Sequence, residues 1–147
     1  MIKIREAKPG DEQSIHDLVY ALAVYEKAPK EVVNTSAQLA IDLFESKICY
    51  AYVAQENNTV IGFALYYISY STWKGKSLYL EDLFVIPDRR KDGVGGLLFD
   101  KVVETAKSWK VKRMDWQILD WNVPALNFYK KKEAHLDSGW VNGRLFF

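Results

Sequence analysis

The sequence predicts an α/β chain of the α+β type, in which a mixed, mostly antiparallel central sheet is flanked by helices. Two observations carry this prediction. In the first half, strand patterns are joined by short turns, which is typical of antiparallel hairpins. In the second half, strand and helical patterns alternate, so that strands are added to the sheet by way of helices. The 147 residues, 49% of them hydrophobic, fit one domain over residues 1–147 with a buried core.

Hydrophobic periodicity and chain-breaking residues place the individual elements. In order, we expect a strand at 2–5, helices opening at 11 and 34, strands at 50–55, 59–71 and 77–86, a helix after 96, a strand at 114–121, a helix from 122, and strands at 134–139 and 144–147. Asn57-Asn58 is expected to turn the first hairpin. Gly62, inside a long strand, indicates a bulge or the close approach of another backbone.

Composition excludes several classes of function. The 20 Lys and Arg residues balance 19 Asp and Glu residues, so no basic field marks a nucleic-acid-binding protein. Cys49 is the only cysteine, and His16 and His135 have no partners at metal-ligand spacing, so neither a disulfide nor a metal site is expected. The chain has no apolar run of membrane-spanning length and no apolar signal core at its start, so we expect a cytoplasmic protein.

The segment 88–98 lies between a predicted strand and a predicted helix, and glycine is concentrated in it at Gly93–Gly96. A helix N-terminus has unpaired N–H groups and partial positive charge, and glycines let a pyrophosphate approach its backbone. Arg89, Arg90 and Lys91 add positive charge at the same place. A solvated, glycine-rich turn explains the same pattern. The segment matches neither a Walker loop nor a dinucleotide-binding fingerprint.

Three strings give this segment a context. Arg90-Lys91-Asp92-Gly93-Val94-Gly95, the strand over 78–85 and the string over 121–129 resemble the coenzyme A signature and element order of GNAT acetyltransferases. Residues 22–26 and 62–67, together with Trp73, are similar to the diamine (spermidine/spermine) branch, which includes thialysine acetyltransferases. The resemblance runs nearly end to end.

The resemblance implies that acetyl-CoA is the acetyl donor and a small amine the acceptor, in a homodimer. The implied cofactor-binding residues are Leu83, Phe84, Val85, Arg90, Lys91, Asp92, Gly93, Val94, Gly95, Gly96, Asn122, Val123, Pro124, Ala125 and Tyr129. The sequence departs from the branch in two places, and the first is the loop, where the residue after Arg90 is usually glycine and Lys91-Asp92 stands here. Asp92 would repel a phosphate unless it points away, and Glu133 stands where a glycine usually ends the last helix. The chain also stops at Phe147, earlier than we would expect for the branch.

Two residues are candidate catalytic groups. Glu81-Asp82 interrupts an apolar strand, so at least one carboxylate is expected in a partly buried place, either in a structural ion pair or at a functional site. The resemblance makes Glu81 the base that takes a proton from the amine, directly or through water. It makes Tyr129 the acid for the departing thiolate, whereas without it Tyr129 is simply an aromatic residue of an amphipathic helix.

The acceptor site is expected to be aromatic and acidic, which suits a cationic amine. The implied substrate-binding residues are Tyr25, Glu26, Trp73, Glu81 and Asp82. A core contact at Tyr25 and a solvated Glu26 remain the alternative. The sequence leaves open a different acceptor, such as a protein N-terminus or an aminoglycoside, and a non-catalytic acetyl-CoA-binding module.

Overall fold

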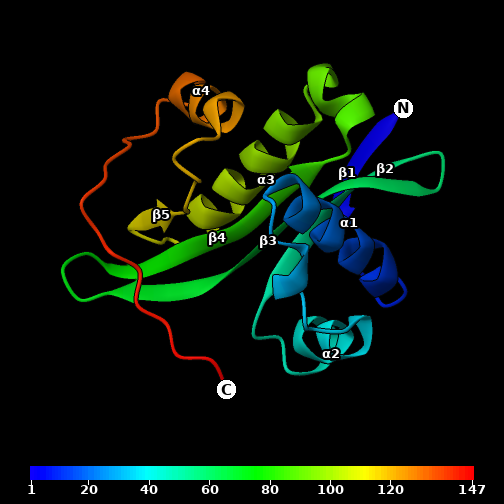
Figure 1. Ribbon diagram of the computed structural model, residues 1–147, viewed down its shortest axis with the longest axis horizontal. Helices are drawn as coiled ribbons and strands as arrows, with labels where there is room; N and C mark the ends of the chain where they lie inside the picture. The colour runs from blue at the N-terminus through cyan, green and yellow to red at the C-terminus, as the bar shows by residue number, and fades with distance from the viewer. The chain divides into compact units, whose positions relative to one another are not determined.

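A computed structural model describes all 147 residues and divides them into two compact units, Met1–Gln117 (unit 1) and Ile118–Phe147 (unit 2). Unit 1 contains a five-stranded sheet with the strand order β1-β2-β3-β4-β5 (Figure 1). Its strands are β1 (Ile2–Glu6), β2 (Tyr50–Glu56), β3 (Thr59–Ser71), β4 (Gly75–Val85) and β5 (Arg113–Asp115). Neighbouring strands are antiparallel except for the parallel β4–β5 pair, so the predicted mixed sheet is confirmed.

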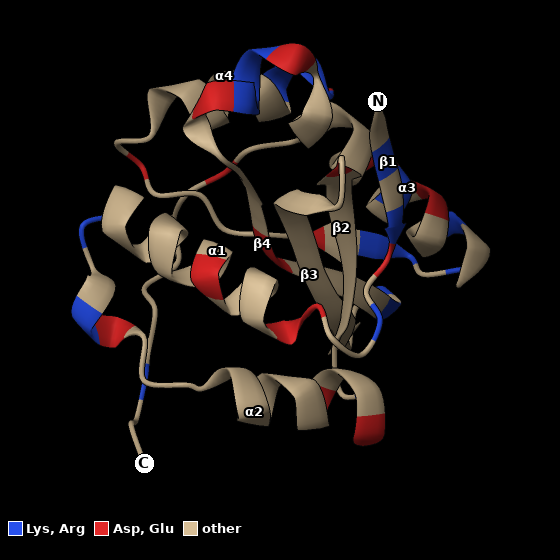
Figure 2. Cartoon of the chain, turned by 90° about the vertical axis from the view of Figure 1, so that its right-hand side faces the viewer, with Lys and Arg blue, Asp and Glu red and all other residues tan.

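The helices of unit 1 cover both faces of this sheet, with α1 and α2 on one side and α3 on the other (Figure 2). The helices are α1 (Glu12–Tyr25), α2 (Ser36–Ala40), which continues as the π-helical turn η2 (Ile41–Glu45), and α3 (Val94–Ser108). Two 3-10 turns, η1 (Pro29–Glu31) and η3 (Pro87–Asp92), precede α2 and α3. The predicted order of elements is therefore confirmed as far as β5.

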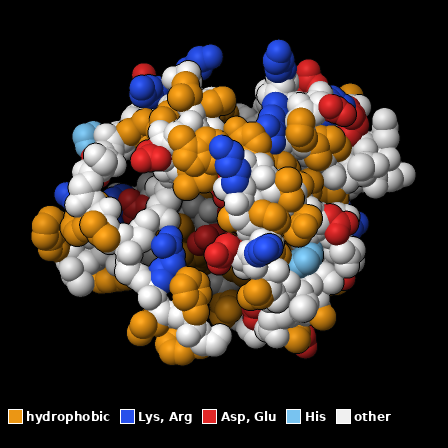
Figure 3. Space-filling model, viewed as in Figure 1, with side chains coloured by type: hydrophobic (Ala, Val, Ile, Leu, Met, Phe, Trp, Pro, Cys, Tyr) orange, Lys and Arg blue, Asp and Glu red, His pale blue; other side chains and the backbone are white.

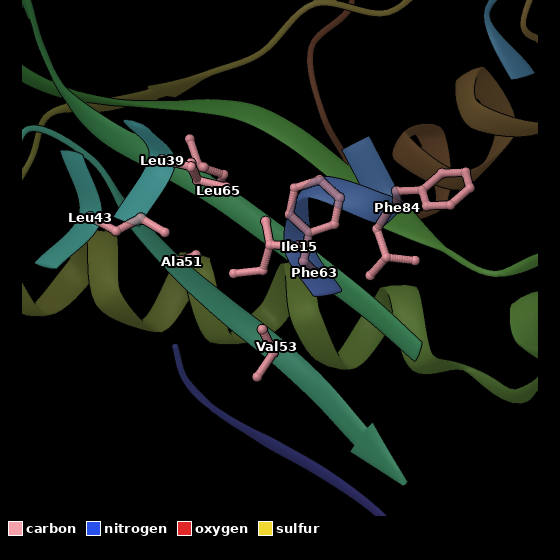
Figure 4. Close-up of a cluster of buried hydrophobic side chains, with 9 residues drawn as sticks. Ile15, Leu39, Leu43, Ala51, Val53, Phe63, Leu65 and Phe84 are labelled. Carbon is pink, nitrogen blue, oxygen red and sulfur yellow. The ribbon is translucent and has the colours of Figure 1, made fainter. Parts of the chain in front are cut away.

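The core on the α1 and α2 face is built from alternate residues of the strands. Ile15 of α1 is fully buried against Val53 and Phe63, and Phe84 of β4 belongs to the same cluster (Figure 4). Burying side chains of this size contributes about 1.5–3 kcal/mol each. This packing places the end of α1 beside the second half of β4.

On the α3 face, Gly62 accounts for a close approach between strands. A Cβ at this position would lie 2.9 Å from the carbonyl oxygen of Phe84 and 3.3 Å from a methyl of Leu98 on α3. The β2–β3 register also shifts between Ala54 and Gln55, beside Gly62. Both features expected from Gly62, a bulge and a close approach, are present.

Unit 2 contains one helix, α4 (Val123–Lys131). The two strands expected at 134–139 and 144–147 are not formed. That prediction was wrong because an alternating apolar pattern makes a strand only when it pairs with another strand, and no residue of 134–147 is paired in a sheet. The strand expected at 114–121 is also shorter, since pairing with β4 ends at Asp115. Neither unit has a helix long and apolar enough to span a membrane.

Candidate active site

β4 changes its surroundings partway along its length. Its pairing with β5 ends at Tyr79, so the rest of the strand has a strand partner only on the β3 side. The amide of Ile86 donates to the carbonyl of Ile61 at 2.9 Å, just beyond the last paired residue, Val85. Because hydrogen-bonded and non-hydrogen-bonded pairs alternate in an antiparallel ladder, the N–H and C=O groups of Val85 and Leu83 point away from β3. We call this side of β4 the open edge.

A β-bulge lies at the start of the open edge. Asp82 pairs with Leu65 and Leu80 pairs with Tyr66, which leaves Glu81 as an extra residue on β4. A bulge re-aims side chains and bends the strand, and such irregularities are frequent beside active sites. The interruption of the apolar pattern by two carboxylates therefore coincides with an interruption of the ladder.

Three carboxyl groups gather here into an acidic recess formed by Glu26, Glu81 and Asp82. Glu26 caps the C-terminus of α1, and burial raises the pKa of its carboxyl. Burial, with the nearby carboxylates of Glu81 and Glu26, raises the pKa of Asp82 to about 7. An Oε of Glu81 accepts a hydrogen bond from the Tyr67 hydroxyl at 3.4 Å. Figure 3 shows acidic side chains in a hollow over β4, beside the end of α1.

No salt bridge in the structure involves any of these three carboxylates. Their negative charge is therefore uncompensated by Lys or Arg, which favours the binding of an external cation. A carboxyl group that titrates near neutral pH is also suited to accept a proton from a reacting group. The recess thus combines the two properties needed to handle an amine.

The glycine-rich turn follows β4 directly. After η3, Gly93 adopts the left-handed conformation with φ 78°, and α3 starts at Val94. The first hydrogen bond of α3 runs from the Leu97 amide to the Gly93 carbonyl. The amides of residues 94–96 therefore precede the first hydrogen bond within the helix. A helix N-terminus of this kind attracts anions.

The two arginines of this turn have different partners. Arg89 donates to Glu56 of β2 and, at 2.6 Å, to the carboxylate of Asp92. Asp92 is therefore neutralised within the turn, which answers the concern that it would repel a phosphate. Arg90 and Lys91 take no part in this network.

Arg90 is exposed, yet its side chain contacts both β4 and α1. Its Nε donates to the Val85 carbonyl at 3.0 Å. Its guanidinium carbon lies 4.7 Å from the ring centre of Tyr25 and 5.1 Å from that of Phe84. These distances are those of cation–π contacts. The same side chain thus touches the open edge and the last residue of α1.

The aromatic residues expected around the acceptor are not all brought together. Tyr25, the last residue of α1, precedes Glu26 of the acidic recess. Trp73 lies in the turn between β3 and β4 and is 90% exposed. At a strand rise of ~3.3 Å per residue, that turn is roughly 20 Å along β4 from Asp82. Within one chain, Trp73 is therefore remote from the recess.

Unit 2 contains the remaining predicted residues. The Asn122 side chain accepts a hydrogen bond from the Ala125 amide at 3.3 Å and caps α4, with Pro124 in the first turn, as its sequence predicts. Val123 begins the helix, and Tyr129 lies in its second half, where its ring contacts Phe128 edge to face at 5.0 Å between centroids.

The end of α4 forms the hydrogen-bond pattern that usually requires glycine. The Ala134 amide donates to the Tyr129 carbonyl at 3.1 Å and the Glu133 amide to the Lys130 carbonyl at 3.0 Å. Glu133 adopts φ 62°, in the left-handed region. The cap is therefore complete with glutamate in the glycine position, at a conformational cost of roughly 1–2 kcal/mol.

Sequence reasoning missed the environment of Glu81. Tyr67 donates to its carboxylate, and the Tyr67 ring lies 5.4 Å from that of Tyr79. Counting back from the β3–β4 turn could have paired these two tyrosines, because Ser71 faces Gly75. The bulge that brings Glu81 to them has no local sequence signal.

The arrangement of an open strand edge followed by a glycine turn and helix N-terminus agrees with a comparison against known families. The model of the acetyltransferase (GNAT) family matches residues 15–133. The chain therefore belongs to the GNAT family and is an acyltransferase, as the sequence motifs predicted.

Two curated relatives come from the branch expected from the sequence. Thialysine N-epsilon-acetyltransferase of Bos taurus is 38% identical over 138 residues, which cover 88% of this chain and 81% of the bovine protein. Spermidine/spermine N(1)-acetyltransferase-like protein 1 of Homo sapiens is 30% identical over 94% of this chain and 21% of its own length. A solved aminoglycoside acetyltransferase from an uncultured soil metagenomic sample shares the fold, with a TM-score of 0.81 at 18% identity and coverage of 99% and 96% of the two chains.

The GNAT family uses acetyl-CoA as its acetyl donor, and the residues present fit that molecule. The open edge offers the N–H and C=O groups of Leu83 and Val85 to an amide-bearing arm. The α3 N-terminus and the left-handed Gly93 can receive a pyrophosphate.

Proposed function

We propose that this protein transfers an acetyl group from acetyl-CoA to a small cationic amine, either a polyamine or diamine or a thialysine-like compound. The observation that carries this proposal is the acidic recess, in which three carboxyl groups have no salt-bridge partner. An ammonium group supplies the missing positive charge. The relatives named for thialysine and for spermidine/spermine support the same class of acceptor.

Glu81 is the residue to which we assign removal of the amine proton, directly or through water. An alkylammonium with a pKa of about 10.4 is charged at neutral pH, so it must lose a proton before it attacks. Asp82 and Glu26 hold the charged form of the acceptor near Glu81, and the raised pKa of Asp82 lets that carboxyl share the proton. The hydrogen bond from Tyr67 orients the Glu81 carboxylate.

Tyr129 is the residue to which we assign the final proton transfer, from its Oη to the departing sulfur. A phenol with a pKa near ~10 remains protonated at neutral pH and can protonate a thiolate whose conjugate acid titrates near ~8.5. This role requires units 1 and 2 to work as one N-acetyltransferase domain over residues 1–147. The family match, which spans residues from both units, supports that requirement.

Acetyl-CoA supplies the activated acetyl thioester, and we assign its binding to two groups of residues. Leu83, Phe84 and Val85 of the open edge pair with its pantetheine arm, and residues 90–96 receive its pyrophosphate. We also assign acetyl-CoA binding to the cap and first turn of α4, which are Asn122, Val123, Pro124 and Ala125.

Tyr25 forms an aromatic wall of the acceptor site in this proposal, next to Glu26. Trp73 can form a second wall only if another copy of the chain brings its β3–β4 turn to the recess, because the turn is remote within one chain. The proposed homodimer provides such a copy.

The test is acetyl-CoA turnover against thialysine, spermidine, lysine and a peptide N-terminus, with wild-type protein and Tyr129→Phe. We expect the wild type to prefer thialysine or spermidine. Tyr129→Phe should lower kcat about 10²–10⁴-fold at nearly unchanged acetyl-CoA affinity, because only a proton donor is lost. Turnover of the peptide alone would refute the proposed acceptor class, and a kcat change below threefold would refute the role of Tyr129.

A further inference from the structure

The Arg90 side chain lies where we expect both the cofactor and the amine to bind. Arg90 donates to the carbonyl of Val85, which points to the open edge where the pantetheine arm is proposed to pair. Its guanidinium also covers the ring of Tyr25, the proposed aromatic wall for the amine.

These contacts conflict with binding of either substrate. A carbonyl that accepts from Arg90 has part of its hydrogen-bonding capacity engaged on the side where the cofactor must approach. An ammonium group cannot stack on the Tyr25 face that a guanidinium already covers, because the two positive charges repel each other and occupy the same space.

The cofactor provides a force that can move Arg90. A guanidinium forms stronger hydrogen bonds with phosphate oxygens than with a neutral carbonyl, because both partners are charged. The pyrophosphate site proposed over residues 90–96 includes Arg90 itself, so the side chain needs only to rotate.

We propose that Arg90 is a gate that makes amine binding depend on the cofactor: it covers Tyr25 in the cofactor-free protein and leaves Tyr25 when CoA binds. This inference rests on the proposed function. CoA and the amine therefore bind with positive coupling, and the amine binds well only after CoA. In this proposal Arg90 has two roles, since it binds the pyrophosphate and it controls access to Tyr25 and the open edge.

Arg89 is a matched control for this gate. It lies next to Arg90 and carries the same charge, but its guanidinium is held by Glu56 and Asp92. Replacement of Arg89 changes the charge of the turn without uncovering Tyr25.

The experiment measures thialysine binding by calorimetry to the cofactor-free protein and to the protein saturated with CoA. Spermidine replaces thialysine if spermidine is the amine that the wild type acetylates. Wild type, Arg90→Ala, Arg90→Gln and Arg89→Ala are compared, each after its acetyl-CoA affinity is known, so that saturation is ensured. Coupling between sites typically amounts to about 5–150-fold, and we expect the wild-type affinity ratio to reach at least fivefold.

Arg90→Ala should reduce this ratio to less than half of the wild-type value by tightening amine binding to the cofactor-free protein. Arg90→Gln should do the same, and Arg89→Ala should keep the wild-type ratio. A wild-type ratio below about fivefold, or an Arg90→Ala ratio above half the wild-type value, overturns the gate. The gate is also overturned if the affinity ratio falls because the amine binds the CoA complex more weakly, since a merely structural role of Arg90 predicts that result.

A turnover measurement on the same wild-type preparation separates the two proposals. If neither thialysine nor spermidine is acetylated, the proposed function fails and the gate fails with it. If one is acetylated without coupling to CoA, only the gate fails.

Discussion

The two halves of β4 differ in what surrounds them, although they are one strand. The first half has β3 on one side and β5 on the other, and Ser77 and Leu78 within it are fully buried. The second half keeps β3 but has no strand on its other side beyond Tyr79, and there it carries the bulge at Glu81. The comparison teaches that one strand can stabilise the sheet where it is paired on both sides and can leave backbone groups available where one side is open, which is where we propose that the cofactor binds.

Proline substitution within the open half gives the largest contrast. Leu83→Pro removes an N–H that points to the open edge, so we expect the fold to survive and acetyl-CoA affinity to fall about tenfold or more. Phe84→Pro removes an N–H that faces β3 together with a buried ring, and should destabilise the protein by roughly 3 kcal/mol or more. Urea unfolding and CoA calorimetry check the pair. Equal loss of stability in both variants would contradict the assigned directions of the backbone groups.

Truncation in the paired half should show the opposite behaviour. Leu78 is fully buried between the layers, so Leu78→Ala should reduce the free energy of unfolding by about 2–5 kcal/mol. Acetyl-CoA affinity of the folded fraction should change less than twofold. Urea unfolding measures the free energy of unfolding. CoA calorimetry, at a temperature at which the variant is folded, measures the affinity. A large loss of affinity at unchanged stability would show that the paired half also serves the ligand.

The smallest expected effect is a pH-dependent change in amine affinity, caused by titration of Asp82 in the acidic recess. Because the pKa of Asp82 is raised to about 7, its carboxyl is mostly neutral at pH 6 and mostly charged at pH 8. An alkylammonium with a pKa of about 10.4 stays charged over this range, so amine affinity should rise several-fold between these two pH values. Asp82→Asn should abolish the rise, and Glu81→Gln should shift its midpoint to lower pH. Calorimetry with the CoA-saturated protein checks both.

The same shift predicts the sign of a stability change. A carboxyl whose pKa is higher in the folded than in the unfolded protein makes stability fall as pH rises from about 4 to about 7. Asp82→Asn should remove that fall. A wild-type free energy of unfolding that increases across this window while the variant's does not would exclude the raised pKa.

The sequence allowed the order of elements through β5 and α4 to be predicted, because helical periodicity, Pro124 and the glycines act locally. It could not place the bulge at Glu81, since a bulge is a property of the register between two strands. The direction of Arg90 was equally inaccessible, because it depends on Tyr25, which is distant in sequence. The two strands predicted after α4 failed for a related reason, since a strand needs a partner edge that local pattern does not reveal.

Gly62 lies in β3, where it pairs with Val85 of the open half of β4. A single methyl group at this position would meet the Phe84 carbonyl at 2.9 Å, a backbone atom that cannot swing aside as a flexible side chain can. The absence of a Cβ at Gly62 thus sets the spacing between β3 and the part of β4 to which we assign cofactor binding. A larger side chain at position 62 would therefore displace β4, and with it the backbone groups that we expect to pair with the cofactor arm.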